Sequence, residues 1–263
     1  MGVVGARRVL ITGAGGLIGN VLRTGLSPHH ELRGLDVRRG DGVDVVADLA
    51  KGRRRARLAF RDQDAVIDLA ADASVSTPWP RVLRNNLAAT VNCFEAARAA
   101  GVERVIFASS NHVMGLYESE EPYARLVRGD YDDLDPGRLP MLTATHPIKP
   151  DSPYGVGKAF GEAVGRYYSD GHGLSVICLR IGTCNRADRP ENEREYATLI
   201  THADLARLVD CCLRAPASLR YGVYYGVSAN TWRFWDLTAA REEIGYEPQD
   251  DAEVWRASAS AER

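Results

Sequence analysis

Short runs of apolar and β-branched residues alternate along the chain with longer segments in which apolar positions recur every three to four residues. Strands that are buried on both faces are apolar throughout, and alternation with helices is typical of parallel strand pairing. The pattern predicts an α/β fold, with helices on both faces of one doubly wound parallel sheet. The predicted strands are residues 8–12, 31–36, 43–47, 65–70, 104–108, 174–180 and 222–227.

Capping residues mark the ends of the predicted helices. Gly101 suits the left-handed position that follows a helix, and Pro153 suits a first helical turn with Ser152 as its N-cap. Residues 222–227 and 232–244 complete a small C-terminal part. The helices expected from apolar spacing are residues 17–26, 81–100, about 153–169 and 202–213.

Residues 115–150 interrupt this rhythm, because they are charged and aromatic and contain five prolines. A loop of this length within a compact domain is usually functional or disordered. It separates a serine pair, Ser109 and Ser110, from Tyr154. This position favours an ordered excursion near a site, with a surface insertion as the alternative.

The composition is that of an ordinary globular protein of 263 residues, with 26% charged residues and a net charge of −2. This balance gives no reason to expect nucleic acid or a membrane as a partner, and the basic run at 51–57 is expected to be a solvated helix face. The five cysteines include no Cys-x-x-Cys pair and the histidines have no metal-ligand spacing. The first eight residues lack the order of a signal peptide. We therefore expect reduced thiols, a cytoplasmic protein and no metal.

A glycine-rich segment, residues 12–19, follows the first predicted strand and opens the first predicted helix. A helix N-terminus offers unpaired N–H groups and the positive end of its dipole, and both favour phosphate. Three glycines at every third position form a variant dinucleotide fingerprint, suited to a tight turn, close approach to a pyrophosphate and close helix packing. The residues expected to contact a dinucleotide here are Gly13, Gly16, Leu17, Ile18 and Gly19.

Asp36 ends the second predicted strand, where a carboxylate can accept hydrogen bonds from the ribose diol of adenosine. The same carboxylate would repel a 2′-phosphate, so NAD is favoured over NADP, although Arg38 and Arg39 oppose this preference. Asp48 is expected either to face the adenine or to be a plain turn residue.

Tyr154 and Lys158 are four residues apart on a predicted helix, so their side chains share one face. A nearby opposite charge lowers the pKa of an acid, and Tyr154 is therefore a candidate proton acceptor beside an ammonium. The pair alone is a weak signal. Its place after a dinucleotide loop and a serine pair indicates an oxidoreductase.

In this order the motifs resemble those of the extended short-chain dehydrogenase/reductase family, which has a Rossmann fold and includes NAD-dependent epimerases and dehydratases. The resemblance implies that Ser110 binds the reacting oxygen, Tyr154 exchanges its proton and Lys158 holds the nicotinamide ribose. Asp68 departs from the family, which commonly has histidine there. Asn86 either joins a proton relay at the cofactor site, as the family pattern implies, or caps a neighbouring backbone group. The further cofactor contacts that the resemblance implies are Leu49, Leu69, Ala70 and Ala71.

A closer resemblance is to the uronate dehydrogenase branch and its NAD-dependent glucose-6-phosphate dehydrogenase relatives. It is carried by residues 107–112, 150–152, 180–184 and 225–230. It implies that Asn111 and His112 bind sugar hydroxyls and that Arg180 clamps an anionic group, which a planar guanidinium does well. A structural histidine and an interior ion pair are the alternatives. Ser74 is expected either to meet the substrate or to be a turn residue.

We therefore expect NAD-dependent oxidation of the anomeric carbon of a small sugar to a lactone. Residues 1–180 would form the NAD-binding domain and residues 181–263 a small substrate-binding part. A nucleotide-sugar epimerase or dehydratase is the alternative; it is opposed by the short C-terminal part and by Asn111–His112, where dehydration by resemblance needs an acidic pair. A non-catalytic dinucleotide sensor is a third possibility. A homodimer is expected because small symmetric oligomers are common.

Overall fold

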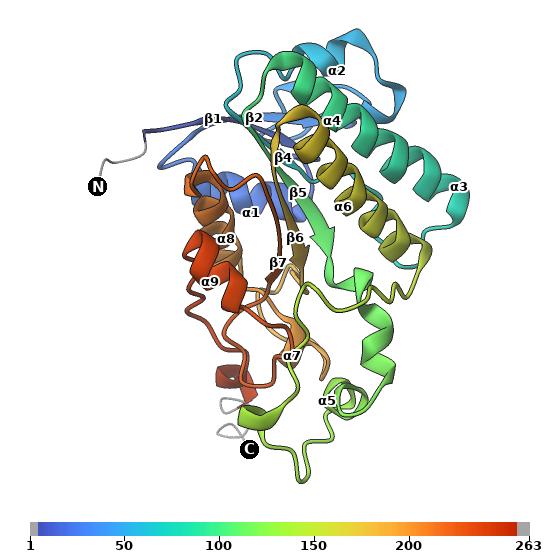
Figure 1. Ribbon diagram of the computed structural model, residues 1–263, viewed down its shortest axis with the longest axis vertical. Helices are drawn as coiled ribbons and strands as arrows, with labels where there is room; N and C mark the ends of the chain where they lie inside the picture. The colour runs from blue at the N-terminus through green and yellow to red at the C-terminus, as the bar shows by residue number, and fades with distance from the viewer. Residues whose placement is uncertain (1–4, 257–263) are drawn as a thin grey trace.

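The computed structural model describes residues 5–256; residues 257–263 and the first four residues of the segment considered for a signal peptide lie outside this description. A sheet of seven strands forms the centre of the molecule, in the order β3-β2-β1-β4-β5-β6-β7 (Figure 1). All neighbouring strands are parallel, which confirms the predicted doubly wound sheet. The strands are β1 (Arg8–Thr12), β2 (Glu31–Asp36), β3 (Val45–Val46), β4 (Ala65–Asp68), β5 (Arg104–Ser110), β6 (Ser175–Ile181) and β7 (Tyr221–Gly226).

Helices cover both faces of this sheet (Figure 1). One face carries α1 (Leu17–Leu26), α8 (His202–Arg214) and α9 (Thr238–Ile244). The other face carries α2 (Arg54–Leu58), α4 (Ala89–Ala100) and α6 (Pro153–His172). The helix predicted over residues 81–100 begins earlier and is irregular, because α3 (Trp79–Val82) and a π-helical turn, η2 (Leu83–Ala88), run directly into α4.

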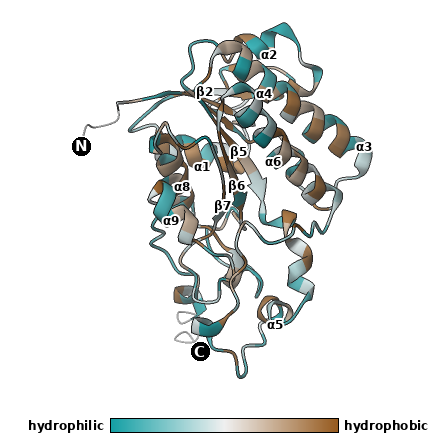
Figure 2. Ribbon diagram, viewed as in Figure 1, coloured by the Kyte–Doolittle hydropathy of each residue, from teal (hydrophilic) through white to brown (hydrophobic). Residues whose placement is uncertain are grey.

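Two apolar cores lie on the two faces of the sheet, because successive residues of a strand point to opposite sides. In β1, Val9 and Ile11 pack with residues of α1 and α8, whereas Leu10 packs with residues of α4. Apolar residues accordingly gather along the strands and on the helix faces next to them (Figure 2). The sheet is therefore buried on both sides, as continuous apolar strands require.

The expected capping residues hold the helix that carries the candidate base. Ser152 Oγ accepts the backbone N–H of Gly155 at 3.1 Å, which fixes the start of α6. Gly101 has φ +73° and closes α4 as predicted. Two predicted strands are shorter than expected: β3 is confined to two residues, and β4 ends at Asp68 although a strand was predicted over residues 65–70. Within residues 232–244 a helix begins at Thr238.

The excursion, residues 115–150, is ordered and contains η4 (Gly115–Ser119), α5 (Tyr123–Arg128) and η5 (Pro136–Arg138). Leu142 forms a parallel bridge with Trp235, and Tyr117 and Tyr123 pack into the core. None of the helices between residues 5 and 256 combines the length and apolarity needed to cross a bilayer. The division of the chain into two parts at residue 180 stays a prediction. The elements β7 and α8, which follow residue 180 in the sequence, belong to the central sheet and to one of its helical layers.

Candidate active site

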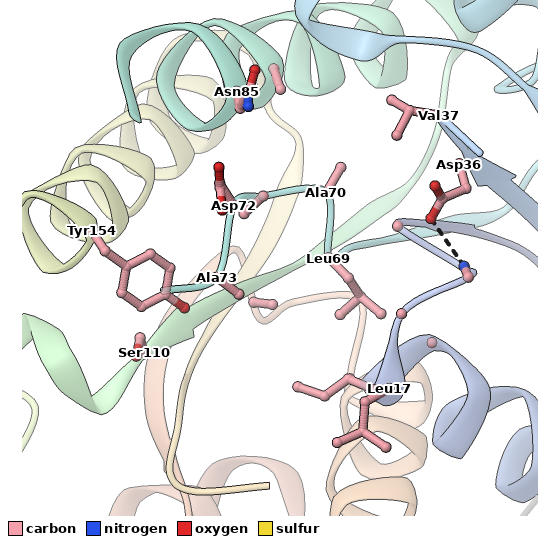
Figure 3. Close-up of a pocket in the computed structure, with 18 of the residues that line it drawn as sticks. Leu17, Asp36, Val37, Leu69, Ala70, Asp72, Ala73, Asn85, Ser110 and Tyr154 are labelled. Atoms are coloured by element: carbon pink, nitrogen blue, oxygen red, sulfur yellow. Dashed lines mark hydrogen bonds between the residues drawn. The ribbon is translucent and has the colours of Figure 1, made fainter. Parts of the chain in front are cut away.

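A pocket of about 1380 Å³ opens at the carboxyl ends of the strands, where ligands bind in open parallel sheets. The glycine loop and the end of β2 line one half of it. The end of β5 and the first turns of α6 line the other half, where Ser110 and Tyr154 lie close together (Figure 3). Residues 181–184 and 194–195 also line the pocket. The loop after β4 runs between the halves and contributes Leu69, Ala70 and Ala71, as expected.

The glycine loop has the geometry that a dinucleotide phosphate needs. Gly13 has φ +66°, a conformation that side chains disfavour, and an added Cβ would lie 3.0 Å from the Leu69 carbonyl. At Gly19 an added Cβ would lie 2.5 Å from the Ala14 oxygen, so helix and loop pack as closely as predicted. Leu17 and Ile18 open α1 and line the pocket with the glycines. The N-terminal N–H groups of α1 therefore face the cavity without obstruction.

The acidic groups of this half lie where the sequence predicted them. Asp36 ends β2, and its carboxylate accepts the N–H groups of Gly15 and Arg38, each at 3.0 Å (Figure 3). A carboxylate has lone pairs beyond these two bonds, so Asp36 can still accept from a ribose diol. Asp48 caps η1 (Leu49–Lys51) by accepting the N–H of Ala50, and it lines the pocket as Leu49 does.

Ser110, Tyr154 and Lys158 meet on the opposite wall. Ser110 ends β5 and lies beside the ring of Tyr154, which comes from the first turn of α6 (Figure 3). Lys158 lies one helical turn further on and donates from Nζ to the Ala108 carbonyl at 2.6 Å. Its Nζ lies 5.7 Å from the centroid of the Tyr154 ring. The spacing of four residues thus places both groups on one wall, as predicted.

Burial dominates the electrostatics of this trio. Burial raises the pKa of Tyr154, and the hydrogen bond from Ser110 lowers it only in part. This direction is opposite to the sequence expectation, which counted the ammonium and not the desolvation. Burial likewise lowers the pKa of Lys158 to about 8, while the Asp68 carboxylate acts to raise it. Asp68 is itself buried and accepts a 2.6 Å hydrogen bond from Thr12.

Asn111 and His112 follow Ser110 and line the same half of the pocket. The Asn111 side chain is buried, and its Nδ2 has no hydrogen-bond partner within residues 5–256, so an unsatisfied donor lies at this wall of the pocket. His112 Nδ1 lies 2.6 Å from Asp151 Oδ2, which leaves Nε2 for a ligand. Its ring meets the Tyr154 ring edge-on at 6.0 Å.

Two expected site residues lie outside the pocket lining. Ser74 is exposed and shares a hydrogen bond with Ser76 at 2.8 Å, as a turn residue does. Asn86 is buried, accepts the backbone N–H of Asp72 at 2.9 Å and donates to its carbonyl at 3.3 Å. The structure therefore favours the turn for Ser74 and the backbone cap for Asn86. Both hold the loop after β4 and do not face the cavity.

Arg180 also lies outside the lining, contrary to the expected anion clamp. Its Nε and Nη2 donate to the two carboxylate oxygens of Glu162 at 2.9 and 2.8 Å. Burial alone lowers the pKa of Arg180, but Glu162 outweighs it and the pKa lies above its ordinary value. The alternative of an interior ion pair is therefore what the structure shows. Its Nη1 donates to the Tyr225 hydroxyl and to the Ala144 carbonyl, which ties the excursion to the sheet.

Replacing Arg180 with alanine is expected to lower the free energy of unfolding by about 3–5 kcal/mol, because Glu162 would keep a buried, unpaired charge. Urea denaturation measures this change. The matched control is Arg166→Ala, which breaks an exposed ion pair with Asp170 on α6, the helix that also carries Glu162. This change should lower the free energy of unfolding by at most about 1 kcal/mol. Equal stability of the two variants would contradict the structural role.

Arg194 lines the pocket together with residues 181–184, and no sequence pattern singled it out. It precedes a short helix, α7 (Glu195–Thr198), in a polar stretch without periodicity. Its Nη2 donates to Glu118 Oε1 at 2.7 Å, and Nη1 donates to Thr183 Oγ1 at 3.0 Å. The only available signal was its place beyond the carboxyl end of β6, where a substrate residue is expected.

Comparisons with known proteins agree with this geometry. The NAD dependent epimerase/dehydratase family matches residues 9–207. The chain is 37% identical to the NAD-dependent glucose-6-phosphate dehydrogenase of Haloferax volcanii, over 93% of this chain and 94% of that protein. It is 36% identical to the uronate dehydrogenase of Pseudomonas syringae pv. tomato, over 97% and 86%. A mutant of the uronate dehydrogenase of Agrobacterium tumefaciens, solved in complex with NAD, is 33% identical over 97% and 89%, with a TM-score of 0.82.

Proposed function

The chain belongs to the NAD-dependent epimerase/dehydratase family, and we propose that it is an NAD-dependent dehydrogenase that oxidises the anomeric carbon of a small cyclic sugar to a lactone. The observation that carries this proposal is the meeting of Ser110, Tyr154 and Lys158 on one wall of a pocket whose other half is a dinucleotide loop. The similar dehydrogenases that act on glucose 6-phosphate and on uronates support it.

NAD fits the residues present in the first half of the pocket. The glycines leave room for the pyrophosphate at the start of α1, and Asp36 offers acceptors to the adenosine ribose. Leu69, Ala70 and Ala71 line the passage towards Tyr154. When bound, the cofactor supplies the acceptor for the hydride that leaves the sugar.

The residues of the second half supply proton transfer and orientation. Tyr154 takes the proton of the anomeric hydroxyl as the C1–H bond breaks, so that C1 becomes the lactone carbonyl carbon. Ser110 donates a hydrogen bond to the oxygen that becomes this carbonyl. Lys158, as an ammonium, stabilises the Tyr154 anion and can hold the nicotinamide ribose. Asn111 Nδ2 and His112 Nε2 are the polar groups free to bind the other hydroxyls.

The experiment that tests this function follows NADH absorbance with glucuronate, galacturonate, glucose 6-phosphate and neutral aldoses, with lactone identified as the product. We expect net NADH formation with at least one of these sugars. The alternative is a nucleotide-sugar epimerase or dehydratase. Tightly retained NAD, no NADH release and an isomerised nucleotide sugar would establish the alternative.

Two broader properties belong to the same proposal. A homodimer through α4 and α6 is supported by Val91, Val156 and Tyr167, which are apolar or aromatic and exposed on these adjoining helices. The molar mass from light scattering decides this point. A cytoplasmic location is supported by the five cysteines, all of which are free thiols.

A further inference from the structure

In the half of the pocket beyond Tyr154, the guanidinium of Arg194 is paired with the carboxylate of Glu118. This half, which we call the sugar subsite, is lined by Asn111, His112, Thr183 and Arg194. Arg194 reaches it from the segment after β6, while Glu118 approaches Arg194 from the excursion. Whether this subsite accepts an anion depends on what else the guanidinium binds.

Both carboxylate oxygens of Glu118 accept hydrogen bonds from Arg194. Arg194 Nε donates to Oε2 at 2.5 Å and Nη2 donates to Oε1 at 2.7 Å, the forked arrangement in which a guanidinium binds a carboxylate best. Nη1 donates to the hydroxyls of Thr183 and Thr198 at 3.0 and 3.4 Å. Of the five N–H groups of a guanidinium, one on Nη2 is left for a ligand.

The pair is also largely shielded from water. The Glu118 side chain is 14% exposed and that of Arg194 is 26% exposed. Burial alone lowers the pKa of Arg194, but its hydrogen bonds with Glu118 outweigh this and the pKa lies above its ordinary value. A fork in such surroundings is costly to open from one side, because the abandoned partner keeps an unpaired charge.

The other charges around the subsite do not replace this cation. His112 is held by Asp151, and Arg180 is held by Glu162 behind the wall. Glu195 lines the pocket as a further carboxylate, which accepts amide hydrogens from Asn185 and Asn192 and forms no ion pair with a cation between residues 5 and 256. Lys158 donates to the Ala108 carbonyl beside Tyr154, and the Asp68 carboxylate favours its charged form.

Arg81 and Arg84 line the pocket from α3 and η2, and Arg38 and Arg39 line it from the segment after β2. Arg81 is paired with Asp72, and Arg84 is exposed and donates to Asn85. The described charges of the sugar subsite are therefore balanced or negative. A carboxylate or phosphate on the sugar could accept only the remaining N–H of Arg194 unless it displaced Glu118, and it would face the carboxylates of Glu118 and Glu195. Juxtaposed like charges are strongly unfavourable.

An uncharged sugar meets none of these costs. Its hydroxyls can accept from Asn111 Nδ2 and from the remaining N–H of Arg194, and can donate to His112 Nε2. These are single, directed hydrogen bonds of the kind that select between sugars.

We infer that the substrate is an uncharged aldose and that Glu118 sets this preference by neutralising Arg194. This inference rests on the dehydrogenase function proposed above. It names the substrate class of that site and makes Glu118 a residue that determines specificity through Arg194.

The first test compares matched sugars on the wild-type enzyme: glucose with glucuronate and glucose 6-phosphate, galactose with galacturonate, and arabinose as a further neutral aldose. The expected result is a kcat/KM about 100-fold higher for a neutral aldose than for any anionic sugar in the set. A uronate or a sugar phosphate as the best substrate would overturn the inference and leave the dehydrogenase function standing. NAD reduction by none of the sugars would overturn both.

The second test removes the charge of Glu118 while keeping its shape. Glu118→Gln should raise the ratio of kcat/KM for an anionic sugar to kcat/KM for its neutral match by about tenfold or more, because Arg194 regains an uncompensated charge. The control is Glu121→Gln, which removes an exposed pair with Arg128 on the same excursion and should leave the ratio unchanged. An unchanged ratio in the Glu118 variant would overturn its assigned role.

Discussion

Replacing Tyr154 with phenylalanine is expected to lower kcat by about 10³-fold, the usual scale for a lost general base. The substitution removes one oxygen from a ring that already packs between Ser110 and His112. Because the ring itself remains, the pocket wall and the glycine loop should be preserved. NAD affinity is therefore expected to change by no more than about threefold, and the lost rate is a loss of chemistry.

Initial rates of NADH formation and calorimetric titration with NAD separate these two effects. The control is Tyr167→Phe, since Tyr167 lies on the same helix but its side chain faces solvent. This variant should match the wild type in both measurements. Full turnover by the Tyr154 variant, with NAD bound normally, would show that another group accepts the proton.

The parts of the site that the sequence predicted correctly are those set by neighbours along the chain. The glycine spacing specifies a turn and a helix start within eight residues, and the structure reproduces both. Ser152 and Pro153 likewise fix the start of α6, and so the positions of Tyr154 and Lys158 on it. Such local rules need no knowledge of what packs around them.

Sequence rules that depend on neighbouring residues did not predict the positions of the Arg180 and Arg194 side chains. Arg180 lies near the carboxyl end of β6 and matched a family motif, yet the direction of its side chain is decided by Glu162 on α6. Arg194 has no motif, yet Glu118 and Thr183 hold it at the cavity. In each case the deciding partner comes from another element, and apolar periodicity does not report which carboxylate lies opposite a cation.

The direction of the Tyr154 pKa could not be predicted for the same reason. The sequence shows that an ammonium lies one turn away, and this alone favours the phenolate. It does not show that the ring is enclosed by the walls of a folded pocket, and burial has the larger effect on this group. In the structure the interaction with Ser110 lowers the pKa of Tyr154, but it offsets only part of the effect of burial.

Lys158 is also the residue on which the pH dependence of the enzyme is expected to rest. Replacing it with methionine, an unbranched side chain without charge, should lower kcat/KM by at least about 100-fold, because the Tyr154 anion loses its nearest cation. In the wild type, burial lowers the pKa of Lys158 to about 8. An amine carries its charge below its pKa and loses it above, so activity that needs the ammonium should decline as the pH rises through about 8.

The pH profile of kcat/KM for NAD at saturating sugar reports groups of the free enzyme and measures this limb. The methionine variant should lose the alkaline decline, and its residual rate should continue to rise with pH as Tyr154 ionises. Asp68→Asn provides a second variant, since the Asp68 carboxylate favours the charged form of Lys158. Without that carboxylate the alkaline limb should move to lower pH. A methionine variant with the wild-type limb still in place would assign the decline to another group, because no ammonium would remain at position 158 to titrate.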